Sequence, residues 1–498
     1  MNIKQAKEEI KNMVLTYLAK DGAGEYQIPV VRQRPILLMG PPGIGKTQIM
    51  EQIAKECGIL LVSYTITHHT RQSAVGLPFI QEKNFQGKTY SVTEYTMSEI
   101  IASVYERMEE TGLLEGILFI DEINCVSETL APAMLQFLQC KRFGNQSVPK
   151  GWLIVAAGNP PEYNKSVREF DMVTLDRVRS ISVEADYRVF CEYARNQKIH
   201  GALLSYLKLR PKNFYRIEAD VDGMEYVTAR GWEDFSYLLY SYEGLNLPVS
   251  KEIVYEYLHH KDVAEDVAAY VDLYRKYQDD YGIDQILQGR VKSTVFARIY
   301  EAGFDERLSV VNLLLDGLAI YFRQAFSEKN VTDAYFDFLK SWRSGMGSEE
   351  DYKKAYELRL HEFAESFLKK EKDGFVGREE KEQYHKLEAL LKESIPSAGA
   401  KSMEEAFAWS RGFFDRQRKR LEETTEAAEK ALEYAFDFME EAFEAGEEMV
   451  VFVTELTVSK TAAVFLADYH CERYLQYSKQ LLIGSRKREL LDELERSV

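Results

Sequence analysis

The segment Ile36-Leu-Leu-Met-Gly-Pro-Pro-Gly-Ile-Gly-Lys-Thr47 joins an apolar run to the pattern G-x-x-x-x-G-K-[ST]. The apolar run predicts a buried strand, and the glycines that follow let backbone N–H groups curl around phosphate oxygens. A helix that begins at Lys46 would point the positive end of its dipole at the same anion. The segment therefore predicts a site for a nucleoside triphosphate rather than a chance glycine-rich turn.

The residues of this loop have separate expected roles. Lys46 would reach the β and γ phosphates of ATP, and Thr47 would ligate Mg²⁺. The remaining contacts would come from the loop backbone and the first turn of the helix. The expected nucleotide-binding residues are Gly40, Pro41, Pro42, Gly43, Ile44, Gly45, Lys46, Thr47 and Gln48.

A second acidic element follows in Ile117-Leu-Phe-Ile-Asp121-Glu122. Asp121, at the end of a buried strand, would hold Mg²⁺ through water or through the ligand sphere of Thr47. Glu122 would polarise the attacking water, because strand alternation sends the two carboxylates in different directions. The alternative is a solvated Asp-Glu pair with no catalytic task.

Composition limits the classes of function. The chain has 498 residues and a formal net charge of −17. Its length favours about three domains. The acidic balance argues against a nucleic-acid groove, which needs clustered Lys and Arg to displace counterions. A protein partner is expected instead.

The cysteines and the apolar runs indicate a location. The five cysteines are odd in number, widely spaced and free of C-x-x-C pairs, which suits a reducing cytoplasm. The longest apolar runs near the carboxyl end, 449–453 and 462–467, are much shorter than the roughly 20 residues of a membrane helix. We therefore expect a cytoplasmic protein without a membrane segment.

Short apolar runs alternate with helical patterns between residues 30 and 185, which predicts a parallel α/β sheet. Two hairpins interrupt the pattern, one within Gly76 to Tyr95 and one around Phe143. We expect both to project from the sheet. The predicted strands are 36–39, 59–65, 117–121, 152–157 and 181–183.

From about residue 186 the pattern is helical, with apolar residues at three- and four-residue steps. The predicted helices include 228–242, 250–281, 309–326, 402–445 and 448–483. The expected domains are an amino-terminal helix (1–25), an α/β core (26–185), a helical lid and extension (186–343) and a carboxyl-terminal helical bundle (349–498).

One apolar stripe in the last domain has two interpretations. It lies among many Glu residues, and it either packs inside the bundle or forms a docking face for another protein. The stripe consists of Leu432, Ala435, Phe436, Met439, Ala442 and Phe443.

With these motifs the chain resembles the AAA+ ATPases, and within them the MoxR-like group. Val155-Ala-Ala-Gly-Asn159 resembles the family's sensor 1 strand, and Leu175-Asp-Arg177 its L-D-R segment. Thr228-Ala-Arg230-Gly-Trp232 resembles the sensor 2 region of the lid. The hairpin within Gly76 to Tyr95 lies where this group carries extra insertions. The resemblance covers roughly residues 30 to 245.

The resemblance implies catalytic roles for three further residues. Asn159 would orient the lytic water, and Arg230 would contact phosphate in the same chain. Arg177 would reach the γ phosphate of a neighbouring subunit, with Arg179 as the substitute. An arginine supplied in this way makes hydrolysis depend on a homo-oligomeric ring, which we expect to be a hexamer.

Three functions are compatible with these motifs. The leading hypothesis is an ATP-driven factor that remodels or matures a protein client, and the resemblance implies a partner with a von Willebrand factor A domain. A nucleic-acid-directed motor is the first alternative, which the acidic charge disfavours. A nucleotide-gated scaffold with very slow hydrolysis is the second, which the combination of Glu122, Asn159 and candidate arginines disfavours.

Overall fold

The chain folds into two compact units in the computed structural model. The first contains Met1–Phe190 and Val227–Gly231, and the second contains Cys191–Tyr226 and Trp232–Val498. The structure describes residues 1–143, 146–163, 167, 170–197, 199–220, 223–345, 352–372, 376–396, 400 and 402–481.

A five-stranded parallel sheet forms the centre of the first unit, as the alternating pattern predicted. The strand order is β2-β5-β8-β1-β9. All seven residues of β8 are buried, as expected for a strand covered on both faces. The strands are β1 (Ile36–Met39), β2 (Leu60–Thr65), β5 (Gly116–Asp121), β8 (Trp152–Gly158) and β9 (Arg179–Ser182).

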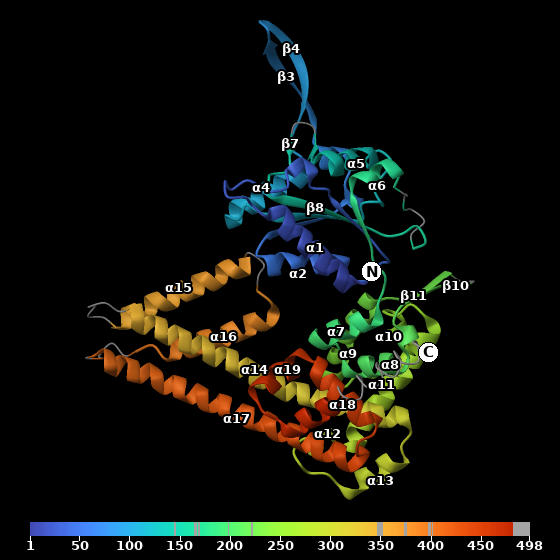
Figure 1. The fold of residues 1–498 in the computed structure, drawn as a ribbon, viewed down its shortest axis with the longest axis vertical. Helices are drawn as coiled ribbons and strands as arrows, with labels where there is room; N and C mark the ends of the chain where they lie inside the picture. The colour runs from blue at the N-terminus through green and yellow to red at the C-terminus, as the bar shows by residue number, and fades with distance from the viewer. Residues whose placement is uncertain are drawn as a thin grey trace, which may run out of the picture. The chain divides into compact units, whose positions relative to one another are not determined.

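Helices cover this sheet (Figure 1). Buried residues of α4 (Glu99–Thr111) and α5 (Ala131–Cys140) share one apolar cluster with Leu118 and Ile120 of β5. The unit also contains α2 (Lys46–Cys57), α3 (Arg71–Val75) and α6 (Met172–Arg177).

The predicted amino-terminal helix is present as α1 (Ile3–Leu18). Asn2 and Gln5 form a capping box at its start. Its apolar stripe is buried, and Lys7 and Lys11 form ion pairs of 2.6 and 2.7 Å with Glu56 of α2. The helix therefore belongs to the first unit.

Both predicted hairpins are present. Strands β3 (Pro78–Phe85) and β4 (Lys88–Tyr95) form a two-stranded ribbon that projects from the unit (Figure 1). Gln86 and Gly87 have φ of 52° and 80°, as a type I′ turn requires. The second hairpin pairs β6 (Arg142–Phe143) with β7 (Gln146–Ser147), and its tip at residues 144–145 lies outside the described part of the chain.

The second unit is mainly helical. A hairpin that the sequence pattern did not indicate, β10 (Arg216–Asp220) with β11 (Gly223–Val227), precedes α9. The helices are α7 (Tyr187–Asn196, which begins in the first unit), α8 (Gly201–Leu209), α9 (Ala229–Gly244), α10 (Lys251–Tyr255), α11 (Lys261–Tyr281), α12 (Ile283–Ile286), α13 (Ser293–Glu301), α14 (Phe304–Gly345), α15 (Tyr352–Lys372), α16 (Arg378–Glu393), α17 (Met403–Phe443), α18 (Glu447–Val458) and α19 (Lys460–Asp468).

Three predicted helix boundaries were wrong. The helix expected over 250–281 is divided into α10 and α11, because the break between them hydrogen-bonds the hairpin through Tyr226 N–H and His259 C=O at 2.9 Å. The helix expected over 448–483 ends at Val458, and Ser459 caps α19. The helix expected over 309–326 extends over the whole of α14, because its apolar face continues to pack along α17.

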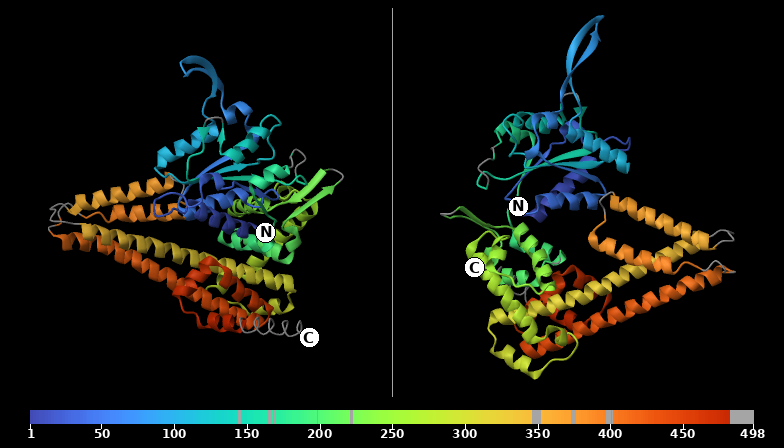
Figure 2. Two further views of the ribbon diagram at one scale, coloured as in Figure 1. Left: turned by 45° about the horizontal axis from the view of Figure 1, so that its top comes forward. Right: turned by 180° about the vertical axis from the view of Figure 1, so that it is seen from behind.

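Helices α14 and α17 lie antiparallel along each other (Figure 2). Glu328 of α14 is buried and accepts a 2.8 Å hydrogen bond from Gln417 of α17, and farther along α14 Tyr335 donates to the Ser410 carbonyl. The six-residue apolar stripe of α17 is buried against this bundle. The packed-core interpretation of the stripe is therefore confirmed.

Within the described residues, no single helix has the length and hydropathy needed to cross a membrane. The pair α18 and α19 passes such a test only jointly, across an 84° bend.

Phe436 provides a test of this packing. Its side chain is 0% exposed, whereas Phe336 of α14 is 53% exposed. Phe436→Ala should lower the free energy of unfolding by about 3–5 kcal/mol, because it leaves a cavity. Phe336→Ala should lower it by less than about 1 kcal/mol. Urea unfolding followed by circular dichroism measures both, and equal losses would contradict the assignment of Phe436 to the core.

Candidate active site

The carboxyl ends of three parallel strands meet at one edge of the sheet. Met39 of β1 pairs with Gly158 of β8, and Ile120 of β5 pairs with Ala156. The glycine-rich loop, Asp121 and Asn159 follow directly after these strands. Ligands of open α/β sheets bind at such an edge.

The loop after β1 needs its glycines for two reasons. Gly43 and Gly45 have φ of 71° and 92°, which side chains disfavour. A Cβ on Gly43 would lie 2.9 Å from Cβ of Thr228, so the loop also packs closely against the segment before Arg230. Gly45 is the N-cap of α2 and provides no side-chain cap, which suits anion binding at this helix end.

Lys46 is buried, and neutral oxygen atoms hold its ammonium group. Its Nζ donates to the carbonyls of Gly40 and Pro41 at 2.8 Å each and to Oδ1 of Asn159 at 2.9 Å. Burial lowers the pKa of Lys46 to about 8, against an opposing effect of Asp121. A bound phosphate would supply the negative charge that these partners lack.

Thr47 and Asp121 form the part of the site suited to a metal. Thr47 Oγ1 donates to Asp121 Oδ2 at 2.9 Å, and the Glu122 N–H donates to Asp121 Oδ1 at 2.9 Å. Hydroxyl and carboxylate oxygens are the ligands that Mg²⁺ prefers. The residues present therefore fit Mg²⁺ bound together with a triphosphate.

Glu122 lies just beyond the last residue of β5. Its φ is 58°, and the Cys125 N–H donates to its carbonyl at 2.8 Å, so the chain turns here. This turn, rather than the strand alternation that we expected, sets the direction of the Glu122 side chain.

Arg230 lies beside the loop. Its backbone N–H donates to the Gly43 carbonyl at 3.2 Å, and its charge contributes to lowering the pKa of Lys46. Thr228 accepts from the Gly231 N–H at 3.2 Å and so fixes the start of α9. The structure thus brings Arg230 together with Lys46, although it is far away in sequence.

Arg177 and Arg179 lie at the opposite edge of the sheet. Arg179 begins β9 and pairs with Ile36, the first residue of β1, and four strand residues span about 10 Å. Both arginines are exposed. Arg177 donates to the Gln139 side chain, whereas Arg179 forms an ion pair with Glu9 of α1.

Asn124 is a site residue that we did not predict. It is 2% exposed, and its side chain hydrogen-bonds the backbone of Asn159. The spacing Asp121-Glu-x-Asn was the available signal, but a polar residue in a turn is too common to attract attention.

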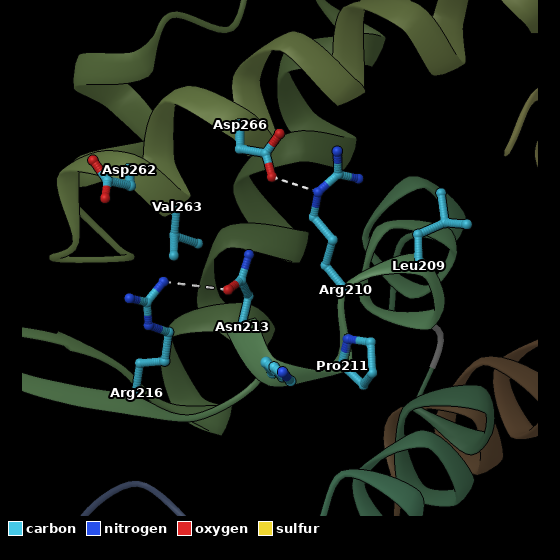
Figure 3. A pocket seen from close by; sticks show the side chains of 9 residues that line it. Leu209, Arg210, Pro211, Asn213, Arg216, Asp262, Val263 and Asp266 are labelled. Carbon is cyan, nitrogen blue, oxygen red and sulfur yellow. Dashed lines mark hydrogen bonds and ion pairs between the residues drawn. The ribbon is translucent and has the colours of Figure 1, made fainter.

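A separate cleft of about 550 Å³ lies in the second unit, beside β10 and α11 (Figure 3). Both arginines that line it already have carboxylate partners: Arg210 pairs with Asp266 at 2.7 Å, and Arg216 pairs with Glu218, outside the lining, at 2.8 Å. The residues that carry the nucleotide motifs are all elsewhere. We therefore do not assign the nucleotide to this cleft.

Comparison with known families agrees with this geometry. Residues 36–174 match the family described as ATPase family associated with various cellular activities (AAA). This region is an AAA domain. No curated protein sequence matches the chain significantly. The matched region contains Lys46, Asp121, Glu122 and Asn159. Three candidate arginines follow it, namely Arg177, Arg179 and Arg230.

The AAA domain and the parallel sheet confirm the expected fold class. It is an α/β AAA+ core with inserted hairpins, followed by a helical lid and an all-α carboxyl-terminal region.

The lowered pKa of Lys46 predicts a pH dependence of ATP binding. The free lysine loses its proton above about pH 8, whereas a bound triphosphate favours the charged form. The dissociation constant should therefore rise above pH 8, approaching about tenfold per pH unit. Fluorescence titration with an ATP analogue from pH 7 to 9.5 measures this. In Lys46→Arg, which stays charged, the rise should vanish, and a flat wild-type curve would contradict the prediction.

Proposed function

We propose that this AAA domain hydrolyses ATP to ADP and phosphate. The observation that carries the proposal is the convergence of three strands on Lys46: its Nζ contacts Asn159 at 2.9 Å, while Thr47, the next residue, contacts Asp121 at 2.9 Å. Mg²⁺, held by Thr47 and Asp121, would neutralise charge on the phosphates.

The remaining chemistry is proposed for side chains of the chain itself. On binding ATP, Lys46 exchanges Asn159 for phosphate oxygens, which frees the Asn159 amide to orient water. Glu122 accepts a proton as the water oxygen bonds to the γ phosphorus and the bond to the bridging oxygen breaks. Arg230 contributes positive charge from the same chain.

We further propose that Arg177 acts on the ATP of a neighbouring subunit in a homo-oligomeric ring, with a hexamer as the expected size. Arg177 starts from the edge of the sheet opposite its own loop, so its own ATP is a poor target. Arg179 already has a carboxylate partner in Glu9, which favours Arg177. Helix α6, which ends at Arg177, begins with Met172 and Val173. These side chains are 84% and 55% exposed and suit a subunit contact.

The cellular role that we propose is that of a MoxR-like factor that remodels or matures a protein client in the cytoplasm. The net charge of −17 favours a protein over a nucleic acid. The five cysteines are free thiols, as suits a reducing compartment. A client or partner with a von Willebrand factor A domain is part of this proposal through the family resemblance alone.

Glu122→Gln tests the hydrolytic step. The amide cannot accept the proton, so kcat should fall by about 10²- to 10⁴-fold while the ATP dissociation constant changes by less than about threefold. A phosphate-release assay and a binding titration measure the two quantities. Glu109→Gln, the same change at an exposed position of α4, should leave both unchanged. A normal rate in Glu122→Gln would remove Glu122 from the mechanism.

Subunit mixing tests the role of Arg177. Arg177→Ala should bind ATP normally but hydrolyse it about 10³-fold more slowly, and Lys46→Ala should not bind it. In mixed rings, a Lys46→Ala subunit supplies an intact Arg177 to a neighbour with an intact loop, so part of the activity should return. Arg179→Ala should lose little activity. Mixed rings that form but remain inactive would exclude action between subunits.

A further inference from the structure

The Asn124 side chain holds the backbone of Asn159 through two hydrogen bonds. Asn124 Nδ2 donates to the Asn159 carbonyl at 2.8 Å, and the Asn159 N–H donates to Asn124 Oδ1 at 3.3 Å. The amide thus satisfies both backbone groups of one residue. Because Asn124 is only 2% exposed, water does not compete freely for these bonds.

The position of this contact explains why it is needed. Strand β8 ends at Gly158, whose carbonyl still accepts from the Gly40 N–H at 3.3 Å. Asn159 lies beyond the strand and is followed by Pro160, which has no N–H. The Asn124 amide therefore supplies the hydrogen bonds of the backbone directly after the strand pairing ends.

The absence of a side chain at Gly158 leaves room for the Asn124 amide. A Cβ on Gly158 would lie 2.6 Å from Asn124 Oδ1, closer than such atoms approach. Its backbone needs no left-handed conformation, so close approach is the reason for glycine here. Gly158 at the end of β8 and Asn124 in the turn after β5 are thus adapted to one contact.

Asn124 also belongs to the turn that carries Glu122. The Cys125 N–H closes this turn on the Glu122 carbonyl at 2.8 Å, and the Ile123 N–H donates to the Ala157 carbonyl at 2.9 Å. The turn is therefore attached to β8 through Ile123 and through Asn124. The side chains of Glu122 and Asn159 are the two proposed to act on the water. Their backbones are held together by these hydrogen bonds between the turn and the end of β8.

We propose that Asn124 is a positioning residue that sets the Asn159 side chain relative to Glu122 during ATP hydrolysis. When Lys46 leaves Asn159 for phosphate, the two hydrogen bonds to Asn124 keep Asn159 in place. Asn124 itself need not touch the nucleotide. This inference rests on the proposed ATPase function.

The test compares ATP binding with single-turnover hydrolysis in the chain of 498 residues. Asn124→Ala and the isosteric Asn124→Asp should lower the hydrolysis rate by about 10²-fold, because the Asn159 side chain is displaced. The ATP dissociation constant should change by less than about threefold. Gly158→Ala, which pushes the amide away, should have the same effect. Cys125→Ala, in the same turn, should change neither quantity.

A double-mutant cycle separates positioning from general support of the fold. If Asn124 acts through the Asn159 side chain, Asn124→Ala should cause no further loss of rate in an Asn159→Ala background. Additive losses, or an Asn124→Asp variant with a normal rate, would overturn the positioning role while leaving the ATPase proposal intact. A wild-type chain that binds ATP without hydrolysing it would instead overturn the proposed function, and the positioning role with it.

Discussion

The ammonium group of Lys46 is the point on which the site depends. It is a positive charge removed from water, and its three close partners are two carbonyls of its own loop and the amide oxygen of Asn159. Such partners compensate a buried charge only in part, so the pKa of Lys46 falls to about 8. The loop is therefore folded around a positive charge that is only partly compensated, and a bound anion would complete the compensation.

The same region depends on two unusually close approaches. Gly43 allows the phosphate loop to lie against Thr228, and Gly158 allows Asn124 to lie against Asn159. Each contact joins segments that are distant in sequence. At each glycine the neighbouring atoms leave no room for a Cβ atom. The sheet thus positions the strand ends, while these contacts determine how the loops after them are fixed. Val227–Gly231 accordingly clusters with the first unit.

The sequence predicted what short-range patterns encode. The loop from Gly40 to Thr47 combines fixed spacing with a backbone requirement for glycine. The buried strands are short apolar runs, and the α17 stripe has a clear helical period. Strand order, in contrast, depends on pairing between distant segments, which periodicity does not contain. The helix break at Ser459 depends on local capping, which the helical pattern around it hides in the sequence. The hydrogen bonds of Asn124 depend on a neighbouring strand, which a turn pattern in the sequence does not reveal.

The β3–β4 ribbon has a consequence for the biochemistry of the isolated protein. It is a two-stranded sheet of eight-residue strands, and Ile80 and Phe85 on it are 77% and 53% exposed. The outer edges of such a ribbon can pair with the same edges of another molecule. Association of that kind would grow with protein concentration and would need neither nucleotide nor Arg177. Dependence on nucleotide is therefore the property that would distinguish the proposed ring from simple strand pairing.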